Sequence, residues 1–129
     1  MTRFYPKLLI LGWKKVNTVE KITNLDYISE IAGGDEYFVK DLIETFVCQV
    51  SEFTHNMNEY LNKKQYGLLA KEAHTAKSSV MLFGLNHLAD RLKEFQLVAE
   101  KQEQIETYPE RIAEFERICQ QAISELKTE

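Results

Sequence analysis

The chain has 129 residues, of which 44% are hydrophobic and 28% are charged, as is usual for one soluble globular domain. Its net charge of −4 argues against a general role in nucleic-acid binding, and no apolar run is long enough to span a bilayer. Cys48 and Cys119 lack Cys-x-x-Cys spacing and fall within helical patterns. The sequence therefore gives no support to a zinc or redox site, and we expect reduced thiols in the core.

Residues 1–20 form an N-terminal extension in which an apolar run, residues 8–11, lies between Lys7 and Trp13. The run is too short for the core of a signal peptide, and no small-residue cleavage site follows it. The extension is either flexible or packed on the rest of the chain. The second arrangement is favoured because the large apolar side chains of the extension would otherwise face water. Residues 21–129 then form the domain.

A short helix is predicted at about residues 24–32, with Asn24 as its N-cap and the Gly33–Gly34 pair at its end. Asp35 is then placed to cap a long helix over residues 36–62. Apolar residues repeat at heptad spacing along this second helix, and two more widen the stripe, so one side should be buried. The stripe consists of Val39, Ile43, Phe46, Val50, Phe53, Met57 and Tyr60, widened by Phe38 and Leu42.

Three more amphipathic helices follow after short loops. One begins near Tyr66 and ends before Gly84, which is placed as its left-handed C-terminal residue; the next covers about residues 86–104. The last opens at residues 107–110, which resemble a capping box with proline in the first turn. The predicted buried stripes are Leu69, Ala73, Ala76, Val80 and Phe83; then Leu85, Leu88, Leu92, Phe95 and Ala99; then Ile112, Phe115, Cys119, Ala122 and Leu126.

Short loops make consecutive helices antiparallel neighbours. The predicted fold class is therefore all-α: an up-down-up-down four-helix bundle with a short additional N-terminal helix.

His74 lies outside the apolar stripe of its helix, about 100° round the helix axis. Its neighbours on that face are small, cationic or flexible: Gly67, Ala70, Lys71, Lys77, Ser78 and Met81. Residues 61–84 carry a net charge of +3, so the remainder of the chain carries −7. No carboxylate of this helix shares the face, which argues against a general base. A histidine that is itself a nucleophile needs only an exposed nitrogen, a nearby cation and room for a donor.

The segment 73–79, with Gly84 ten positions after His74, resembles the signature of histidine-containing phosphotransfer (HPt) domains. The shared features are the histidine, a lysine three positions later, a serine five positions later and the distant glycine. Two positions depart from the signature: Ala76 replaces a larger apolar residue, and Ser78 replaces a glycine one turn above the histidine. Serine is small enough to keep the approach to the imidazole open.

The resemblance implies a phosphorelay intermediate in two-component signalling. His74 would accept a phosphoryl group from the aspartate of a response-regulator receiver domain and pass it to another receiver, while the receiver supplies Mg²⁺. Hybrid histidine kinases are the other implied partners, and the protein is expected to be a cytoplasmic monomer with no nucleic-acid or membrane partner. Lys77 and Lys71 would offset the phosphate charge, and the residues keeping access and forming the docking surface would be Ser78, Gly67, Ala70 and Met81.

Gln96 is expected to contact His74. If the chain reverses near residues 84–85, the equal rise of two antiparallel helices places His74 level with about residue 95 or 96. Phe95 belongs to the core stripe, so Gln96 is the residue that could hydrogen-bond one ring nitrogen and leave the other free to react. The family commonly has Glu or Gln here, which agrees.

Glu52 and His55 have the Glu-x-x-His spacing of di-metal bundles, but only one copy occurs, so no metal site is predicted. His87 has no partner in spacing, and a capping or surface role is expected. No phosphate-binding glycine-rich loop is present, so the chain is predicted to be a carrier and not a kinase. The alternatives are a helical interaction module that binds receivers without carrying phosphate, and a detached piece of a larger hybrid kinase.

Overall fold

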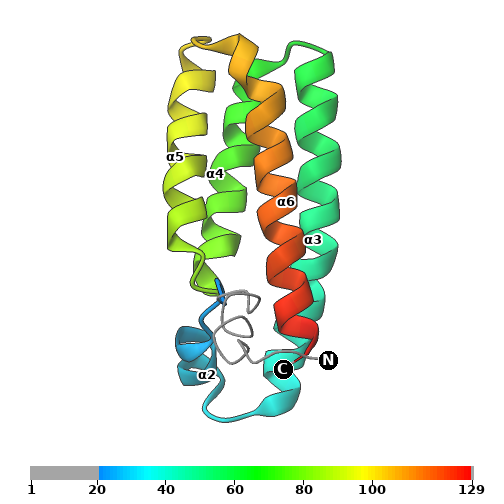
Figure 1. Ribbon diagram of the computed structural model, residues 1–129, viewed down its shortest axis with the longest axis vertical. Helices are drawn as coiled ribbons and strands as arrows, with labels where there is room; N and C mark the ends of the chain where they lie inside the picture. The colour runs from blue at the N-terminus through cyan, green and yellow to red at the C-terminus, as the bar shows by residue number, and fades with distance from the viewer. Residues whose placement is uncertain (1–20, 129) are drawn as a thin grey trace, which may run out of the picture.

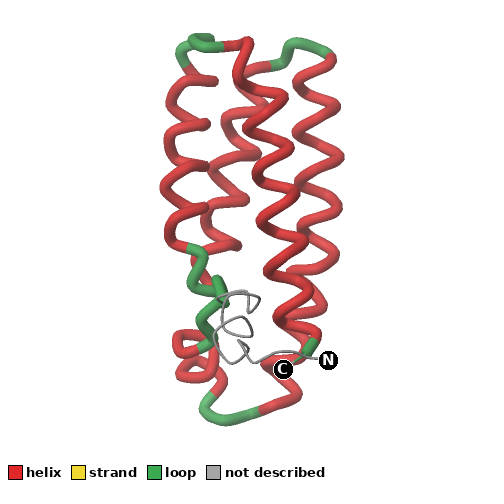
Figure 2. Tube along the Cα trace, in the orientation of Figure 1, coloured by secondary structure: helices red, strands yellow, loops and turns green. Residues whose placement is uncertain are grey.

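The computed structural model describes residues 21–128, so the predictions for residues 1–20 lie outside the described part of the chain. Its helices are α2 (Asp26–Ala32), α3 (Glu36–Asn62), α4 (Tyr66–Leu82), α5 (Asn86–Glu100) and α6 (Tyr108–Lys127), with a short 3₁₀ turn at Ile105–Thr107. The four long helices run alternately up and down side by side, and α2 lies at the end of the bundle that holds the α4–α5 turn (Figure 1). Short loops join them, and the described residues contain no strand (Figure 2). The predicted bundle with one short additional helix is confirmed.

The core is apolar throughout residues 21–128, where no polar or charged residue is buried. Every residue of the stripes predicted for α4, α5 and α6 is buried, as heptad spacing required. Along α3 the buried residues are Phe46, Val50, Phe53 and Met57, in the part that faces the other long helices. Phe38 is 40% exposed, so its prediction as a stripe residue is wrong. The first turns of α3 lie beyond the α4–α5 turn, at the end of the molecule that holds α2, so α4 and α5 do not cover them (Figure 1).

The predicted ends of α2 and α3 are largely confirmed. Helix α2 begins at Asp26, two residues later than predicted, and its N-cap is Leu25, so the prediction of Asn24 as the N-cap is wrong. The Asn24 side chain instead accepts a hydrogen bond from the backbone N–H of Asp26 at 2.8 Å, from one position before the cap. Gly33 adopts the left-handed conformation (φ 62°) that ends α2. Asp35 accepts hydrogen bonds from the backbone N–H groups of Tyr37 and Phe38, at 3.0 and 3.2 Å, and so caps α3.

Hydrogen bonds fix the segment before α2 both to α6 and to the turn between α4 and α5. Glu125 of α6 accepts hydrogen bonds from the backbone N–H groups of Ile22 and Thr23 at 3.0 Å, and from the Thr23 hydroxyl at 2.8 Å. Burial raises the pKa of Glu125, but these hydrogen bonds and one from Gln121 together bring that pKa below its ordinary value. Asn24 N–H donates to the carbonyl of Phe83 at 2.8 Å, which holds the segment against the turn between α4 and α5.

Helix α5 ends at Glu100 and not at residue 104 as predicted. The chain turns there through Gln102, whose φ of 55° is left-handed, while Glu103 N–H donates to Val98 O at 2.9 Å and Gln102 N–H to Ala99 O at 3.1 Å. This pair of bonds is the Schellman ending of a helix, in which glycine usually takes the left-handed position. Because glutamine occupies that position here, the sequence carried no signal for the end of the helix.

The capping box predicted at the start of α6 is wrong. The Thr107 hydroxyl donates to Gln104 O at 2.7 Å and accepts from Arg111 Nε at 2.9 Å, and it makes no cap hydrogen bond. The 3₁₀ turn before α6 brings the Thr107 hydroxyl next to Gln104 O. The hydroxyl therefore bonds to this earlier carbonyl and not to an N–H group in the first turn of α6. Pro109 lies in the first turn of α6 as predicted, where its missing N–H costs nothing.

The two cysteines differ in exposure. Cys119 is fully buried, and this burial raises the pKa of its thiol to about 12, so it is an unreactive core group. Cys48 is exposed on α3, so its prediction as a core thiol is wrong. It lies outside the buried positions of the α3 stripe, where the helical period turns it toward solvent.

Tyr108 fixes the end of α5. Its fully buried side chain donates from the hydroxyl toward Val98 O at 2.9 Å and Glu103 O at 2.6 Å, and its ring packs on Phe95 and Tyr66. Burial raises the pKa of Tyr108, so the hydroxyl stays protonated and able to donate.

We expect Tyr108→Phe to lower the free energy of unfolding by about 1–2 kcal/mol, because one buried and one partly buried carbonyl lose their shared donor. Urea denaturation measures the change. Tyr66→Phe is the matched control, since the half-buried Tyr66 makes a ring contact but no hydroxyl hydrogen bond within the described residues. Equal stabilities of the Tyr108→Phe variant and the wild type would contradict this account of the α5–α6 connection.

Candidate functional site

His74 lies midway along α4 and is exposed. Its chain neighbours on the core side, Ala73 and Ala76, are fully buried. Because residues three and four apart share a face of a helix, burying these alanines fixes the rotation of α4 and turns His74 outward. The imidazole is thus carried on a rigid element and remains open to solvent.

Gln96 of α5 contacts His74, as predicted: His74 Nδ1 lies 3.1 Å from Gln96 Oε1. An amide oxygen only accepts hydrogen bonds, so the proton of the neutral ring belongs on Nδ1. The lone pair of Nε2 is then left free on a residue that is itself exposed. This arrangement suits a nucleophilic nitrogen.

The surface around His74 is a shallow hollow of about 200 Å³ lined by Lys71, Thr75, Gln96 and Glu100. The Thr75 hydroxyl is engaged within α4, since it donates to Lys71 O at 3.1 Å. Glu100 Oε2 accepts a hydrogen bond from Gln96 Nε2 at 3.0 Å. Sequence reasoning missed Glu100, because it considered carboxylates on the histidine helix alone. The available signal was the spacing of four residues between Gln96 and Glu100 on one helix face.

The other predicted site residues are placed unevenly. Gly67, Ser78 and Met81 are exposed on α4, and Met81 is 50% exposed. Ala70 is only 2% exposed, so its prediction as a docking-surface residue is wrong. It lies one turn before His74 but leans toward the core beside Leu69, and a partner could touch little of it.

The two lysines of the site differ in position. Lys71 is exposed and lines the hollow, whereas Lys77 is half-buried and does not line it. Within residues 21–128 neither lysine makes an ion pair, while Lys63 pairs with Glu59 at 2.8 Å. Glu72, the acidic residue of α4, accepts a hydrogen bond from Asn56 of α3 at 2.9 Å. Lys71 and Lys77 therefore place positive charge on α4 near His74, and Glu100 of α5 brings one negative charge to the same hollow.

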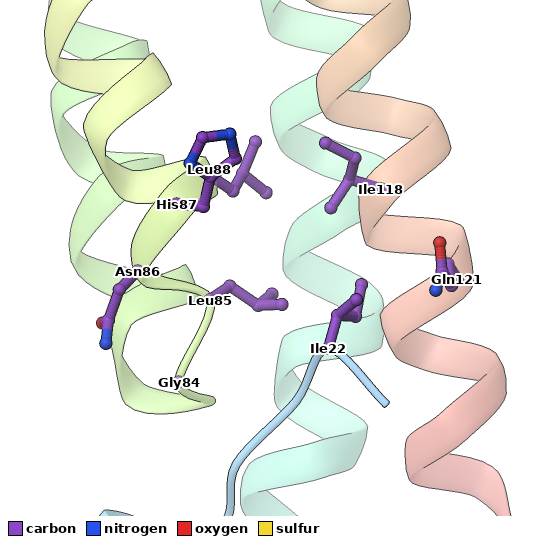
Figure 3. A pocket seen from close by; sticks show the side chains of 8 residues that line it. All are labelled: Ile22, Gly84, Leu85, Asn86, His87, Leu88, Ile118 and Gln121. Atoms are coloured by element: carbon purple, nitrogen blue, oxygen red, sulfur yellow. The ribbon is translucent and has the colours of Figure 1, made fainter. Parts of the chain in front are cut away.

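The remaining histidines lie elsewhere. His55 and Glu52 are exposed on α3, and the described residues contain no group of three or more side chains suited to hold a metal ion. His87 is exposed and makes no cap bond at the start of α5; it borders a mainly apolar hollow of about 310 Å³. Leu85, Leu88, Ile118 and Ile22 point toward one another there (Figure 3). Over residues 21–128, no helix combines the length and apolar character that crossing a membrane requires.

Comparison with known proteins places these features in one context. A family model described as Hpt domain matches residues 41–128, which include His74, Gln96 and Glu100. The phosphorelay intermediate protein YPD1 of Candida albicans is 34% identical over 71 residues, covering 53% of this chain and 39% of that protein. The chain thus matches about two fifths of the length of this relative. No solved structure matches the chain.

Proposed function

The chain belongs to the Hpt domain family, and on that premise we propose that it is a phosphorelay carrier whose phosphoacceptor is His74. The observation that carries the proposal is the contact between His74 Nδ1 and Gln96 Oε1 on an exposed residue, which in the neutral ring places the proton on Nδ1 and leaves the lone pair on Nε2. A nucleophile of this kind needs no ATP site of its own when its donor is already a phosphorylated protein.

The reaction we propose is a direct transfer between side chains. The Nε2 lone pair of His74 attacks the phosphorus of a phosphoaspartate, the bond from phosphorus to the carboxylate oxygen breaks, and the aspartate leaves with the electron pair. The ring then carries a proton on Nδ1 and a phosphoryl group on Nε2, so it becomes positively charged. Gln96 Oε1 accepts from Nδ1–H and stabilises that charge. Onward transfer to a second aspartate is the same step in reverse.

The partners we propose are receiver domains and hybrid histidine kinases, which the family implies. The Mg²⁺ that offsets charge on the transferring phosphoryl group would come from the receiver. This chain would contribute a rigid, exposed imidazole to which two receivers bind in turn. We further propose that the carrier acts as a cytoplasmic monomer.

The proposal is tested with a receiver domain phosphorylated by labelled phosphate and mixed with the purified protein. We expect the labelled phosphate to be transferred from the receiver to this chain after mixing. It should be stable to alkali and labile to acid, as a phosphoramidate is, whereas a phosphoserine at Ser78 or Ser79 would show the reverse. Absence of label with every receiver tried, including those of hybrid kinases, would contradict the proposed function.

Lys71 and Lys77 are proposed to offset the charge of the phosphoryl group. Alanine at either position should slow phosphoryl acceptance about fivefold, since one charge-assisted contact at an exposed or half-buried position contributes about 1 kcal/mol. Single-turnover transfer rates measure the effect, which should shrink at high salt. Lys127→Ala, which removes an exposed charge at the end of α6, is the control and should transfer at the wild-type rate. Equal slowing by Lys127→Ala would show that the effect is one of net charge.

A further inference from the structure

Three side chains form a continuous line of hydrogen bonds from α4 onto α5. His74 Nδ1 meets Gln96 Oε1 at 3.1 Å, and Gln96 Nε2 donates to Glu100 Oε2 at 3.0 Å. Glu100 is the last residue of α5 and is exposed. Within residues 21–128 it makes no ion pair, so the amide of Gln96 is the partner of its carboxylate.

A glutamine by itself does not determine which nitrogen of a neighbouring imidazole carries the proton. The two ends of its amide have nearly the same shape, but the oxygen accepts hydrogen bonds and the NH₂ group donates them. With the oxygen toward the ring, the Nδ1–H tautomer is favoured and Nε2 is free to attack. With the NH₂ group toward the ring, the proton moves to Nε2 and the exposed nitrogen loses its nucleophilic lone pair.

Glu100 removes this ambiguity. An ionised carboxylate can only accept hydrogen bonds, so it attracts the NH₂ end of Gln96 and repels the oxygen end. The oxygen of the amide is then left facing His74. The spacing of four residues on α5 keeps the two side chains neighbours on one helix face.

We propose that Glu100 is a positioning residue, which fixes the amide orientation of Gln96 and through it the Nδ1–H tautomer of His74. The consequence of this positioning for phosphoryl transfer rests on the proposed function, because a free Nε2 matters for reactivity only if His74 accepts the phosphoryl group. Its effect on the tautomer does not depend on any receiver.

The test is the nitrogen NMR spectrum of the His74 ring in full-length protein, at a pH where the ring is neutral and with no receiver present. The wild type should show mainly the Nδ1–H tautomer. In Glu100→Ala the Nδ1–H share should fall toward about half, because both amide orientations become available. In Glu100→Lys it should fall about tenfold relative to the Nε2–H form, because an ammonium group donates to the oxygen of Gln96 and turns the NH₂ group toward the ring.

Two further variants separate orientation from charge and folding. Glu116→Ala removes one exposed negative charge from α6 and should leave the tautomer unchanged. Gln96→Glu replaces the amide by a group that only accepts, so the Nδ1–H form should persist and adding Glu100→Ala should no longer alter it. If the tautomer is the same in wild type, Glu100→Ala and Glu100→Lys, the positioning role is wrong.

Transfer rates connect this role to function. Glu100→Ala should accept label from a phosphorylated receiver about twofold more slowly than wild type, in step with the loss of the Nδ1–H tautomer. Adding Glu100→Ala to Gln96→Glu should produce no further slowing. A tautomer shift in a protein that no receiver labels would support the positioning role and contradict the proposed function. Normal labelling of the wild type together with an unchanged tautomer in the variants would support the proposed function and contradict the positioning role.

Discussion

His74→Gln is expected to abolish phosphoryl acceptance while leaving the bundle folded. Glutamine has no ring nitrogen with a nucleophilic lone pair, so the chemical step has no substitute on this face. Because His74 is exposed, replacing it should change the free energy of unfolding by only about 0.5 kcal/mol or less. The buried stripe of α4 lies on another face of the helix and is untouched.

Labelling by a phosphorylated receiver measures the loss, and thermal unfolding monitored by circular dichroism checks the fold. His55→Gln and His87→Gln are matched controls, since both histidines are exposed and lie away from the hollow around His74. Both should accept label at the wild-type rate. If His74→Gln still accepts phosphate from every receiver that labels the wild type, His74 is not the carrier. A module that binds receivers without carrying phosphate on this histidine then becomes the better description.

Gly84→Ala is expected to cause a large loss of stability, about 2–4 kcal/mol in the free energy of unfolding. Gly84 has a φ of 77°, which L-residues rarely adopt, and a Cβ there would lie 2.5 Å from Asn24 Cβ and 2.9 Å from Asn24 N. Asn24 cannot easily move away, because its N–H donates to Phe83 O at 2.8 Å. The melting temperature should fall by about 10 °C.

Substitutions at two other glycines distinguish the conformational cost of Gly84→Ala from its steric cost. Gly33 also has a positive φ, 62°, but an added Cβ would meet nothing within 4 Å, so Gly33→Ala should show the conformational cost alone. Gly67 is helical and equally open, so Gly67→Ala should be neutral or slightly stabilising. The expected order of loss is Gly84, then Gly33, then Gly67. If Gly84→Ala costs no more than Gly33→Ala, close packing against Asn24 is not the reason for glycine at this position.

Several elements of the site were predictable from the sequence. The rise of two antiparallel helices placed Gln96 beside His74, and the contact is confirmed at 3.1 Å. Heptad spacing predicted the buried faces of α4, α5 and α6, because burial of an amphipathic face follows directly from the helical period. The left-handed Gly84 was predicted from its place after the last helical turn, and its φ agrees.

Other elements depended on contacts between segments. The exposure of Phe38 follows from where the neighbouring helices stop, and the end of α5 is set by Gln102 and Tyr108, neither of which carries a stop signal in the sequence. The role of Glu100 appeared only once its carboxylate was seen to hold the amide of Gln96.

The sequence by itself determined the all-α class, the order of the helices and the face of α4 that carries His74, because local periodicity and loop length fix them. The tertiary structure alone decided which end of the Gln96 amide meets the imidazole and why Gly84 must lack a side chain. Both depend on atoms brought together from distant segments: Glu100 with His74, and Asn24 with the α4–α5 turn. Hydrogen-bond direction and steric overlap act over a few ångströms in space, so even the four-residue spacing of Gln96 and Glu100 does not determine which end of the amide meets His74.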